Sequence, residues 1–282
     1  MTAVFLTGHG DLSCLQVSED FTIPSPPPGW CLVRVKACAI NNTDINTRCG
    51  WYSTDSSTGG AWTTSLSFPL IQGADVSGQI ASVGEGVDGG LVGQRVLLDP
   101  WIIDETGSSP PGYLGSELNG GYATHVIVPV RNVHVISPTC GLSFADLASF
   151  PTAGGTALDM VTRSGLKAGG YWRAVDVVLD VVGGAAFPAV VGSLRTGGKY
   201  VVSGAIGGPI VQLDLRVLYL RDLTFIGATL TSPETFKELV RIVCLGGIKP
   251  SVSATFPLKE IKEAQQAFMD KKFAGKIVLD CE

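Results

Sequence analysis

The feature that most constrains the fold is a change in hydrophobic periodicity after about residue 142. Before it, apolar residues alternate with others in short segments separated by glycines, and Trp30–Ala39 is the longest example. Such period-2 patterning predicts β-strands. After it, helical patterns alternate with apolar runs, and the run 175–182 (VDVVLDVV) is nearly continuous in β-branched residues. That composition is typical of a strand buried on both faces of a parallel sheet. The sequence therefore predicts a β-rich part followed by an α/β part.

The periodicity also predicts the individual elements. In the β-rich part we expect strands over 30–39, 76–83 and 94–99, and two more within 121–135. In the α/β part we expect helices over 154–164, 184–194, 233–245 and 258–271, and strands over 175–182, 199–203, 223–230 and 276–279. Ser143, with Asp146 three residues later, predicts a capped helix start.

Composition narrows the class of protein. Hydrophobic residues make up 45% of the 282 residues and charged residues 16%, which is typical of a globular protein with a core. The net charge is −5 and there is no basic stripe, which argues against nucleic-acid binding. The first ten residues lack a basic stretch before an apolar core, and Asp180 and Pro188 interrupt the most apolar run. We expect a cytoplasmic protein with no membrane or nucleic-acid partner.

The seven cysteines are odd in number and scattered, and no C-x-x-C pair occurs. This pattern predicts free thiols rather than a disulfide framework or a four-cysteine zinc site.

Seven segments together carry a resemblance to a known family. They are NNTDINTRCGWY (41–52), QGADVSGQIASVGEGV (72–87), GGYATHVIVP (120–129), PTAGGTALDMV (151–161), DVVLDVVGG (176–184), GGKYVVSGAIGG (197–208) and AGKIVLD (274–280). In this order they resemble the medium-chain dehydrogenase/reductase superfamily, in its zinc-free, quinone-oxidoreductase-like branch. The resemblance implies an α/β protein with a GroES-like β-rich catalytic domain over 1–135 and 253–282, closed by the C-terminal strand. It also implies a truncated Rossmann-like parallel α/β domain over 136–252.

The resemblance further implies NAD(P)H-dependent hydride transfer to a small quinone or enone carbonyl compound. Alcohol dehydrogenases of this superfamily hold a catalytic zinc with two cysteines and a histidine. The three ligand positions are occupied here by Asn41, Ala74 and Thr152. An amide and a hydroxyl are poor partners for zinc, so we expect no metal site.

The pattern N-x-x-D-x-x-x-R-x-G-x-Y, which includes Asn41, Asp44, Arg48 and Tyr52, matches the active-site stretch of quinone oxidoreductases. The resemblance makes these four the candidate catalytic residues. Asn41 and Tyr52 can each donate a hydrogen bond to a carbonyl oxygen. Arg48 can pair with Asp44 or face an anionic group. The alternative is that Asp44 caps a short helix with Arg48 as its partner.

The dinucleotide fingerprint of this family is missing. The one G-x-G-x-x-G match, at 84–89, precedes another predicted strand, so no helix N-terminus can receive a pyrophosphate. After SGLKAG (164–169) the chain passes at a junction over 169–174 into what resembles the fourth Rossmann strand. Two βαβ-sized units, ~60 residues, are absent, together with the glycine loop and the ribose-binding acid. Strand 175–182 should therefore lie at a sheet edge with apolar surface exposed.

The nicotinamide end of the family's cofactor site remains, and Thr156, Val182, Gly204 and Ala205 match its contacts. NADPH is the expected cofactor, with weak or absent binding to this chain. Three interpretations stay open. The recorded sequence lacks a segment of an enzyme, as an incomplete gene model would; or the chain is a catalytically impaired short form with a binding or regulatory role; or it is a small-molecule-binding module. The exposed edge leaves a homodimer open.

Overall fold

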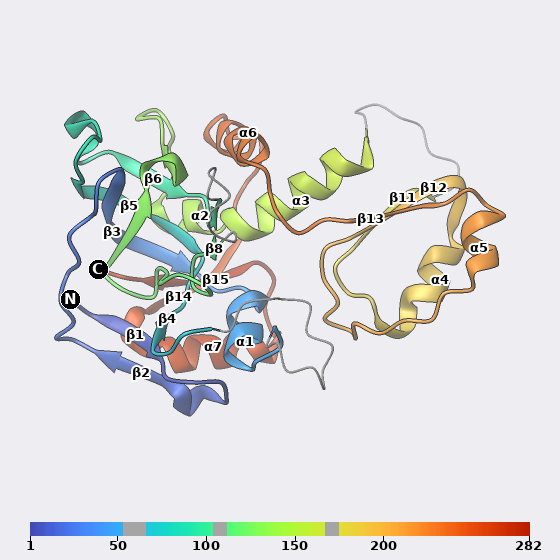
Figure 1. Ribbon diagram of the computed structural model, residues 1–282, viewed down its shortest axis with the longest axis horizontal. Coiled ribbons are helices and arrows are strands. Elements are labelled where there is room, and N and C mark those ends of the chain that lie inside the picture. The colour runs from blue at the N-terminus through green and yellow to red at the C-terminus, as the bar shows by residue number, and fades with distance from the viewer. Residues whose placement is uncertain (53–65, 104–111, 167–174) are drawn as a thin grey trace. The chain divides into compact units, whose positions relative to one another are not determined.

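The computed structural model describes residues 1–52, 66–103, 112–166 and 175–282 (Figure 1). The chain forms two compact units. The β-rich unit comprises Met1–Ala153 and Phe236–Glu282, and the α/β unit comprises Gly154–Thr235. The junction expected over 169–174 lies outside the described residues.

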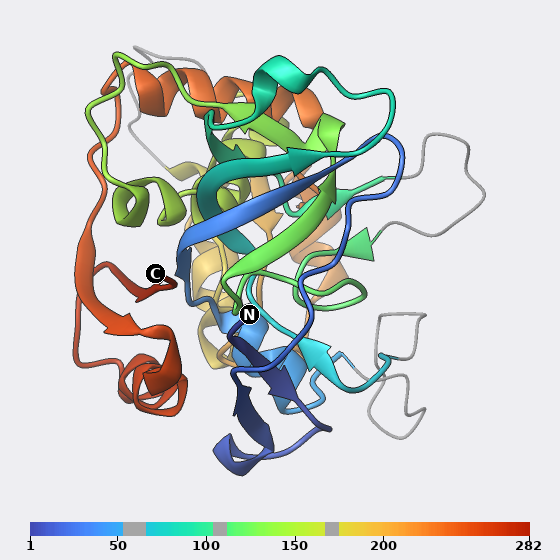
Figure 2. The ribbon, with the colours of Figure 1, turned by 90° about the vertical axis from the view of Figure 1, so that its left-hand side faces the viewer.

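The main sheet of the β-rich unit has seven strands in the order β10-β6-β5-β3-β15-β14, with β9 also paired to β3. Their bounds are β3 (Trp30–Ala39), β5 (Asp75–Val83), β6 (Arg95–Leu98), β9 (His125–Pro129), β10 (Val133–Val135), β14 (Val252–Pro257) and β15 (Lys276–Asp280). Strand β3 runs between β5 and β9, antiparallel to both (Figure 2). The alternation of Trp30–Ala39 therefore predicts the central strand correctly.

The C-terminal strand closes this sheet. β15 pairs antiparallel with β3 and parallel with β14, and the Ile40 amide donates to the Ile277 carbonyl at 2.9 Å. Ile277, Val278 and Leu279 are buried. The expected closure by the last strand is confirmed, and it brings the end of the chain beside residues 39–41.

Smaller elements surround this sheet. Two further sheets contain β1 (Ala3–Leu6), β2 (Leu15–Ser18) and β4 (Leu70–Ile71), and β7 (Trp101–Ile102) with β8 (Gly112–Tyr113). The helices of the unit are α1 (Asn42–Arg48), α2 (Phe144–Ala148) and α7 (Ile261–Asp270). Helix α2 begins at the expected cap, where Ser143 Oγ accepts from the Asp146 amide at 3.1 Å. Helix α7 packs Ile261, Ala264 and Phe268 into the main core.

The α/β unit contains a three-stranded parallel sheet in the order β11-β12-β13. Its strands are β11 (Val175–Asp180), β12 (Leu194–Val202) and β13 (Thr224–Gly227), with helices α4 (Phe187–Gly192) and α5 (Leu215–Tyr219). Helices α3 (Pro151–Ser164) and α6 (Pro233–Cys244) contain the boundaries between the two units. In the described ranges, no helix is long and apolar enough to cross a membrane.

Strand β11 is an edge strand of this sheet as far as the chain is described. Val175 and Leu179 are each 40% exposed. The expectation of a strand buried on both faces is therefore wrong, and the expectation of an exposed edge is confirmed. The physical reason is that β11 hydrogen-bonds only to β12 within the described residues, so nothing there shields its outer side.

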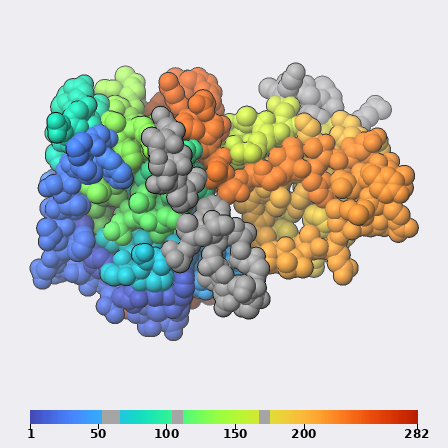
Figure 3. Space-filling model, in the orientation of Figure 1, coloured from blue at the N-terminus to red at the C-terminus, as the bar shows by residue number. Residues whose placement is uncertain are grey.

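More apolar surface lies along the segment that follows β12. Residues 203–223, orange in Figure 3, contribute to the visible surface of this unit. The exposed apolar side chains of this segment are Ile206, Ile210, Leu215, Tyr219 and Leu220. The buried core of the unit consists of two small clusters. One comprises Phe187, Val191, Leu194, Tyr200 and Leu223, and the other comprises Met160, Val201 and Ala228.

The G-x-G-x-x-G match is a turn, as expected. It connects β5 to β6, and a short 3-10 turn at Gly89–Leu91 follows it instead of an α-helix. The Gly84 amide donates to the Trp30 carbonyl at 2.8 Å, which ties the turn to the main sheet.

Gly73 fixes the backbone just before Asp75. Its φ of +100° lies in the left-handed region, and a Cβ there would meet Tyr122 Cδ1 at 2.5 Å and Cys38 Sγ at 2.8 Å. A side chain at this position would therefore add both backbone strain and steric overlap.

We expect Gly73→Ala to lower the free energy of unfolding by about 3 kcal/mol, measured by urea denaturation. Gly86→Ala is the matched control, because Gly86 has φ +79° but no atom within 4 Å of the added Cβ. The control should cost about 1 kcal/mol, from backbone strain alone. Equal losses in the two variants would contradict the packing argument.

Candidate functional site

The site begins where β3 gives way to α1. Asn41 is the N-cap of α1, with extended φ and ψ of −126° and 164°. Its backbone N–H donates to Asp44 Oδ2 at 2.8 Å, so the Asp44 carboxylate closes the first helical turn. The capping interpretation of Asp44 is therefore confirmed. Both residues are buried, Asp44 at 2% exposed and Asn41 at 7%.

Burial controls the protonation of Asp44. Desolvation raises the pKa of this carboxyl to about 7, although the hydrogen bond from the Asn41 amide lowers it. The nearby Asp75 raises the pKa further, and Lys276 lowers it. Asp44 therefore exchanges a proton near neutral pH.

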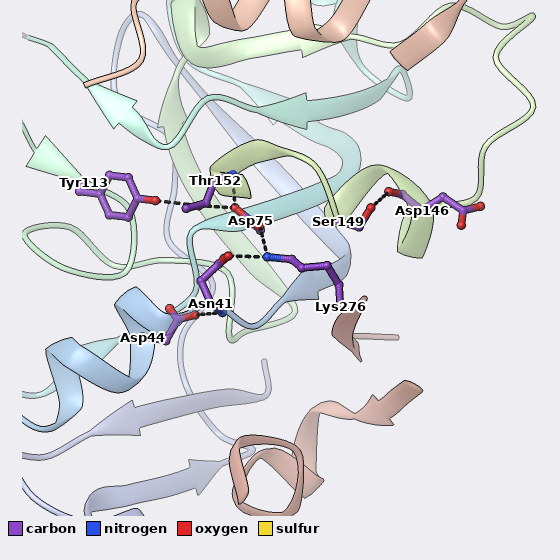
Figure 4. Close-up of polar contacts among 8 residues, drawn as sticks. All are labelled: Asn41, Asp44, Asp75, Tyr113, Asp146, Ser149, Thr152 and Lys276. Carbon is purple, nitrogen blue, oxygen red and sulfur yellow. Dashed lines mark hydrogen bonds and ion pairs between the residues drawn. The ribbon is translucent and has the colours of Figure 1, made fainter. Parts of the chain in front are cut away.

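Five residues around Asp75 form a continuous polar cluster, comprising Asn41, Asp75, Tyr113, Thr152 and Lys276 (Figure 4). Asp75 Oδ1 accepts from the Thr152 amide at 2.7 Å and from Thr152 Oγ1 at 2.5 Å. Asp75 Oδ2 lies 3.1 Å from Lys276 Nζ. Lys276 Nζ also donates to Asn41 Oδ1, and the Tyr113 hydroxyl lies 2.7 Å from Thr152 Oγ1.

The direction of these hydrogen bonds follows from the chemistry of the groups. Because Thr152 gives its hydroxyl proton to Asp75, its oxygen must accept from Tyr113. Burial, followed by the charge of Asp75, raises the pKa of Tyr113 well above its ordinary value, so this hydroxyl keeps its proton. Asp75 is fully buried, and the Lys276 ammonium is its counter-charge.

The structure separates the candidate catalytic residues. Asn41 belongs to the polar cluster, and Asp44 lies one helical turn away. Arg48 does not pair with Asp44; it donates to the Gly10 carbonyl at 2.6 Å and to Gln265 Oε1 at 2.9 Å. The reason is geometric, since the Asp44 carboxylate turns back to the helix start while Arg48 in the last turn reaches α7. The buried Arg48 therefore links α1 to α7.

Tyr52 makes no hydrogen bond to the polar cluster in the described part of the chain, but it lies near enough to Tyr113 to contribute to the raised pKa of that hydroxyl. The half-buried Tyr52 hydroxyl accepts from Asn46 Nδ2 at 3.1 Å.

Sequence reasoning missed Lys276 and did not assign Asp75 a role in this site. Asn41 and Lys276 are 235 positions apart along the chain, so no local pattern connects them. The available signal was the AGKIVLD segment (274–280), which predicts the closing strand. The first residue of that strand is Lys276.

The donor set of the polar cluster does not fit a zinc ion. Ala74 offers no donor atom, and Asn41 Oδ1 and Thr152 Oγ1 are already hydrogen-bonded. The Lys276 ammonium lies against the one carboxylate, where a second cation would be repelled. Across the described residues there is no group of three or more His, Cys, Asp or Glu side chains arranged to hold a metal.

The candidate cofactor residues lie in the α/β unit. Val182 follows β11, and Gly204 and Ala205 follow β12, so all three lie at the carboxyl edge of the parallel sheet. The two loops approach closely: the Gly207 amide donates to the Val182 carbonyl at 2.7 Å, and a Cβ on Gly204 would lie 2.8 Å from the Val181 carbonyl. Thr156 lies on α3, in the same unit.

The turn after β11 does not supply a phosphate cradle. The amides of Val182 and Gly183 donate to Asp180 Oδ1 at 2.7 and 3.1 Å, and the Gly184 amide donates to the Gly208 carbonyl at 3.0 Å. Helix α4 is six residues long, with proline in its first turn. Because these amides are already satisfied, this turn does not fit a dinucleotide pyrophosphate.

The pKa of Asp44 makes stability depend on pH. The folded carboxyl titrates near pH 7 and the unfolded one near 3.8, so the folded state holds the proton more tightly. Stability is therefore unaffected below about pH 4, falls as pH rises from about 4 to 7, and then levels off. We expect Asp44→Asn, which keeps the cap acceptor, to gain stability relative to the wild type over this window. The gain should be at most about 4 kcal/mol by urea denaturation at each pH. A constant difference between pH 4 and 8 would contradict the assignment.

Comparison with known proteins places the chain in a family. The alcohol dehydrogenase GroES-like domain matches residues 27–138, and the zinc-binding dehydrogenase family matches residues 156–279. An NAD-dependent alcohol dehydrogenase of Sulfolobus acidocaldarius is 24% identical over 331 positions, covering 93% of this chain and 95% of the relative. A quinone oxidoreductase of Rattus norvegicus is 23% identical over 332 positions, covering 99% and 97%.

The crystal structure of a candidate alcohol dehydrogenase from Sinorhizobium meliloti 1021 superimposes with a TM-score of 0.91. It is 35% identical, and the match covers 99% of this chain and 96% of that one. The two sequence alignments, of 331 and 332 positions, are longer than the 282 residues of this chain, so both relatives contain residues that it lacks. This agrees with a missing segment of ~60 residues, two βαβ-sized units. The chain belongs to the medium-chain dehydrogenase/reductase superfamily of oxidoreductases.

Proposed function

We propose that the β-rich unit binds a small carbonyl compound of the quinone or enone class without zinc. The parent activity is NAD(P)H-dependent reduction of such a compound. The observation that carries this proposal is the polar cluster, which has hydrogen-bond groups at two of the positions where metal-dependent relatives have ligands. Two relatives support the substrate class: the rat quinone oxidoreductase and an acryloyl-coenzyme A reductase of Metallosphaera sedula, 25% identical over 347 positions.

Asn41 and Tyr52 supply donors for the carbonyl oxygen. An ammonium can only donate, so the Asn41 atom that faces Lys276 is the oxygen Oδ1. The amide nitrogen Nδ2 is then buried without a hydrogen-bond partner in the described part of the chain. A buried donor in this state is accounted for if a ligand oxygen accepts from it. The Tyr52 hydroxyl accepts from Asn46, which leaves its own proton free to donate.

A second candidate function is favoured by the turn after β11. Its satisfied amides leave the cofactor phosphates without the usual cradle, so the chain is a catalytically impaired short form that binds the small molecule. On this proposal Thr156, Val182, Gly204 and Ala205 are the remaining contacts for the nicotinamide end. The protein acts in the cytoplasm.

Carbonyl binding is tested with duroquinone, whose fully methylated ring has no open position for addition of the free thiols. We expect saturable binding to the wild type, followed by tryptophan fluorescence. Asn41→Leu should weaken it about tenfold by removing a buried donor. Gln266→Leu, an exposed amide on α7, is the control and should bind like the wild type. Absence of saturable binding to the wild type would overturn the proposal.

Cofactor binding is tested by calorimetric titration with NADPH and NADH. We expect dissociation constants weaker than roughly 1 mM, since the pyrophosphate has no amide cradle in this chain. Insertion of a glycine-loop βαβ segment between Gly169 and Ala174 should restore tight binding. Micromolar binding to the chain as it is would contradict the impaired form.

Metal analysis after purification in zinc-containing buffer and gel filtration should give well under one zinc per chain, because Asn41, Ala74 and Thr152 replace the ligands. Stoichiometric zinc would overturn the zinc-free assignment.

A further inference from the structure

We propose that Cys140 and Cys244 form a reversible disulfide bond that stabilises the folded chain, and that a low-molecular-weight disulfide such as oxidised glutathione is its oxidant. Both residues belong to the β-rich unit, one before and one after the α/β unit along the chain. All seven cysteines are free thiols in the structure. The inference goes beyond the proposed function, because it assigns a covalent modification to two residues outside the polar cluster.

Helix α6 brings the two cysteines together. Near the start of the helix, the Phe236 ring packs against the His134 ring of β10, with 4.9 Å between the ring centroids. At the last residue of the helix, the Cys244 thiol is hydrogen-bonded to the Cys140 thiol and to the Ser137 backbone. Both ends of α6 therefore contact one stretch of the β-rich unit, residues 134–140.

The segment around Cys140 is anchored by its own hydrogen bonds. The Cys140 amide donates to the Ser137 carbonyl at 2.9 Å, which closes a turn over 137–140. From β6, Arg95 Nη1 donates to the Cys140 carbonyl at 3.2 Å, and Arg95 Nη2 donates to the Leu142 carbonyl. Because both the turn and the helix end are held, the two thiols meet in the folded chain, where a disulfide can form.

The exposure of the two thiols sets the order of the chemical steps. Cys140 is 4% exposed, whereas Cys244 is half-buried. The Cys244 thiolate therefore attacks one sulfur of oxidised glutathione first, forming a mixed disulfide and releasing one glutathione thiolate. The Cys140 thiolate then attacks the Cys244 sulfur, which forms the internal disulfide and releases the second glutathione thiolate. The two protein thiols lose two electrons and two protons, and the two glutathione thiols gain them.

Without an oxidant the pair stays reduced. Burial raises the pKa of the Cys244 thiol, and the adjacent Cys140 raises it further, while the Ser137 backbone and the Arg95 charge lower it. Most of Cys244 is therefore protonated at neutral pH, and the thiolate is the form that attacks a disulfide. The bond is thus a response to an oxidant and not a permanent feature of the fold.

The position of the bond in the chain determines its effect on stability. The two cysteines are 104 positions apart, and the whole α/β unit, residues 154–235, lies between them. A cross-link stabilises a fold mainly by restricting the unfolded chain, and the effect increases with the length of the closed loop. The oxidised chain should therefore resist unfolding better than the reduced chain.

The bond is tested by peptide mapping of the full chain. The protein is incubated with oxidised glutathione, the remaining thiols are blocked with N-ethylmaleimide, and the product is digested with trypsin. Trypsin releases Cys140 in peptide 132–163 and Cys244 in peptide 242–259, and neither peptide contains another cysteine. We expect these two peptides to be joined in most of the oxidised chains and to separate on reduction. Absence of the joined pair, or a glutathione adduct that persists on Cys244, would overturn the inference.

The effect of the bond is measured by thermal unfolding with and without oxidised glutathione. We expect the Tm of the wild type to rise by about 5 °C or more on oxidation. Cys244→Ser keeps a small polar side chain at a half-buried position, and it should show neither the joined peptides nor the rise in Tm. Cys49→Ser, which removes an exposed thiol after α1, is the matched control and should retain both. Joined peptides without a rise in the wild-type Tm would refute the stabilising role, and so would an equal rise in Cys244→Ser.

Discussion

The antiparallel pairing of β15 with β3 is the interaction on which the site of the β-rich unit depends. It places the final strand against the centre of the main sheet, with Ile277, Val278 and Leu279 buried. The same register sets Lys276 beside Asn41, and the Ile40–Ile277 hydrogen bond fixes the backbone next to both. Because successive side chains of a strand point to opposite faces, the pairing of Val278 with Ala39 fixes the face of the sheet on which the Lys276 side chain lies.

The two buried carboxylates near this strand, Asp75 and Asp44, are compensated differently for the loss of water. Asp75 is paired with the Lys276 ammonium and accepts two hydrogen bonds from Thr152. Asp44 has an amide hydrogen bond, and its pKa rises to about 7. The site therefore contains one buried ion pair and one carboxyl whose raised pKa lies near neutral pH. The contrast follows from the position of the lysine, since the ammonium contacts Asp75 directly and lowers the pKa of Asp44 only as a minor contribution.

The α/β unit has a three-stranded parallel sheet among the described residues. Its three strands keep their parallel register, and the loops after β11 and β12 still hold each other through hydrogen bonds. In the edge strand β11, Val175 and Leu179 are exposed. The Asp180 carboxylate at its end accepts hydrogen bonds from the Val182 and Gly183 amides. The backbone amides after β11 are thus hydrogen-bonded within the unit. These bonds stabilise the turn and leave no free amide donors there for a phosphate.

The sequence alone predicted much of the fold because strands and helix starts depend on local patterns of apolar and capping residues. The alternation in 30–39 predicted the limits of β3, and Ser143 with Asp146 predicted the capped start of α2. The missing glycine loop predicted an edge at β11, since a strand without its neighbour must be exposed. Local spacing also placed Asp44 at a helix cap, although it could not choose between that role and a pair with Arg48.

Contacts between distant segments were decided only by the tertiary structure. Arg48 reaches Gln265 across 217 positions, and Lys276 reaches Asn41 across 235. Neither contact can be predicted from the hydrophobic periodicity of the two segments that it joins. The sequence determined which residues lie in strands, helices and turns, and it places Asn41, Ala74 and Thr152 where the family resemblance expects metal ligands. The fold determined which charge lies beside those positions, because strand register and side-chain direction depend on how the whole sheet packs.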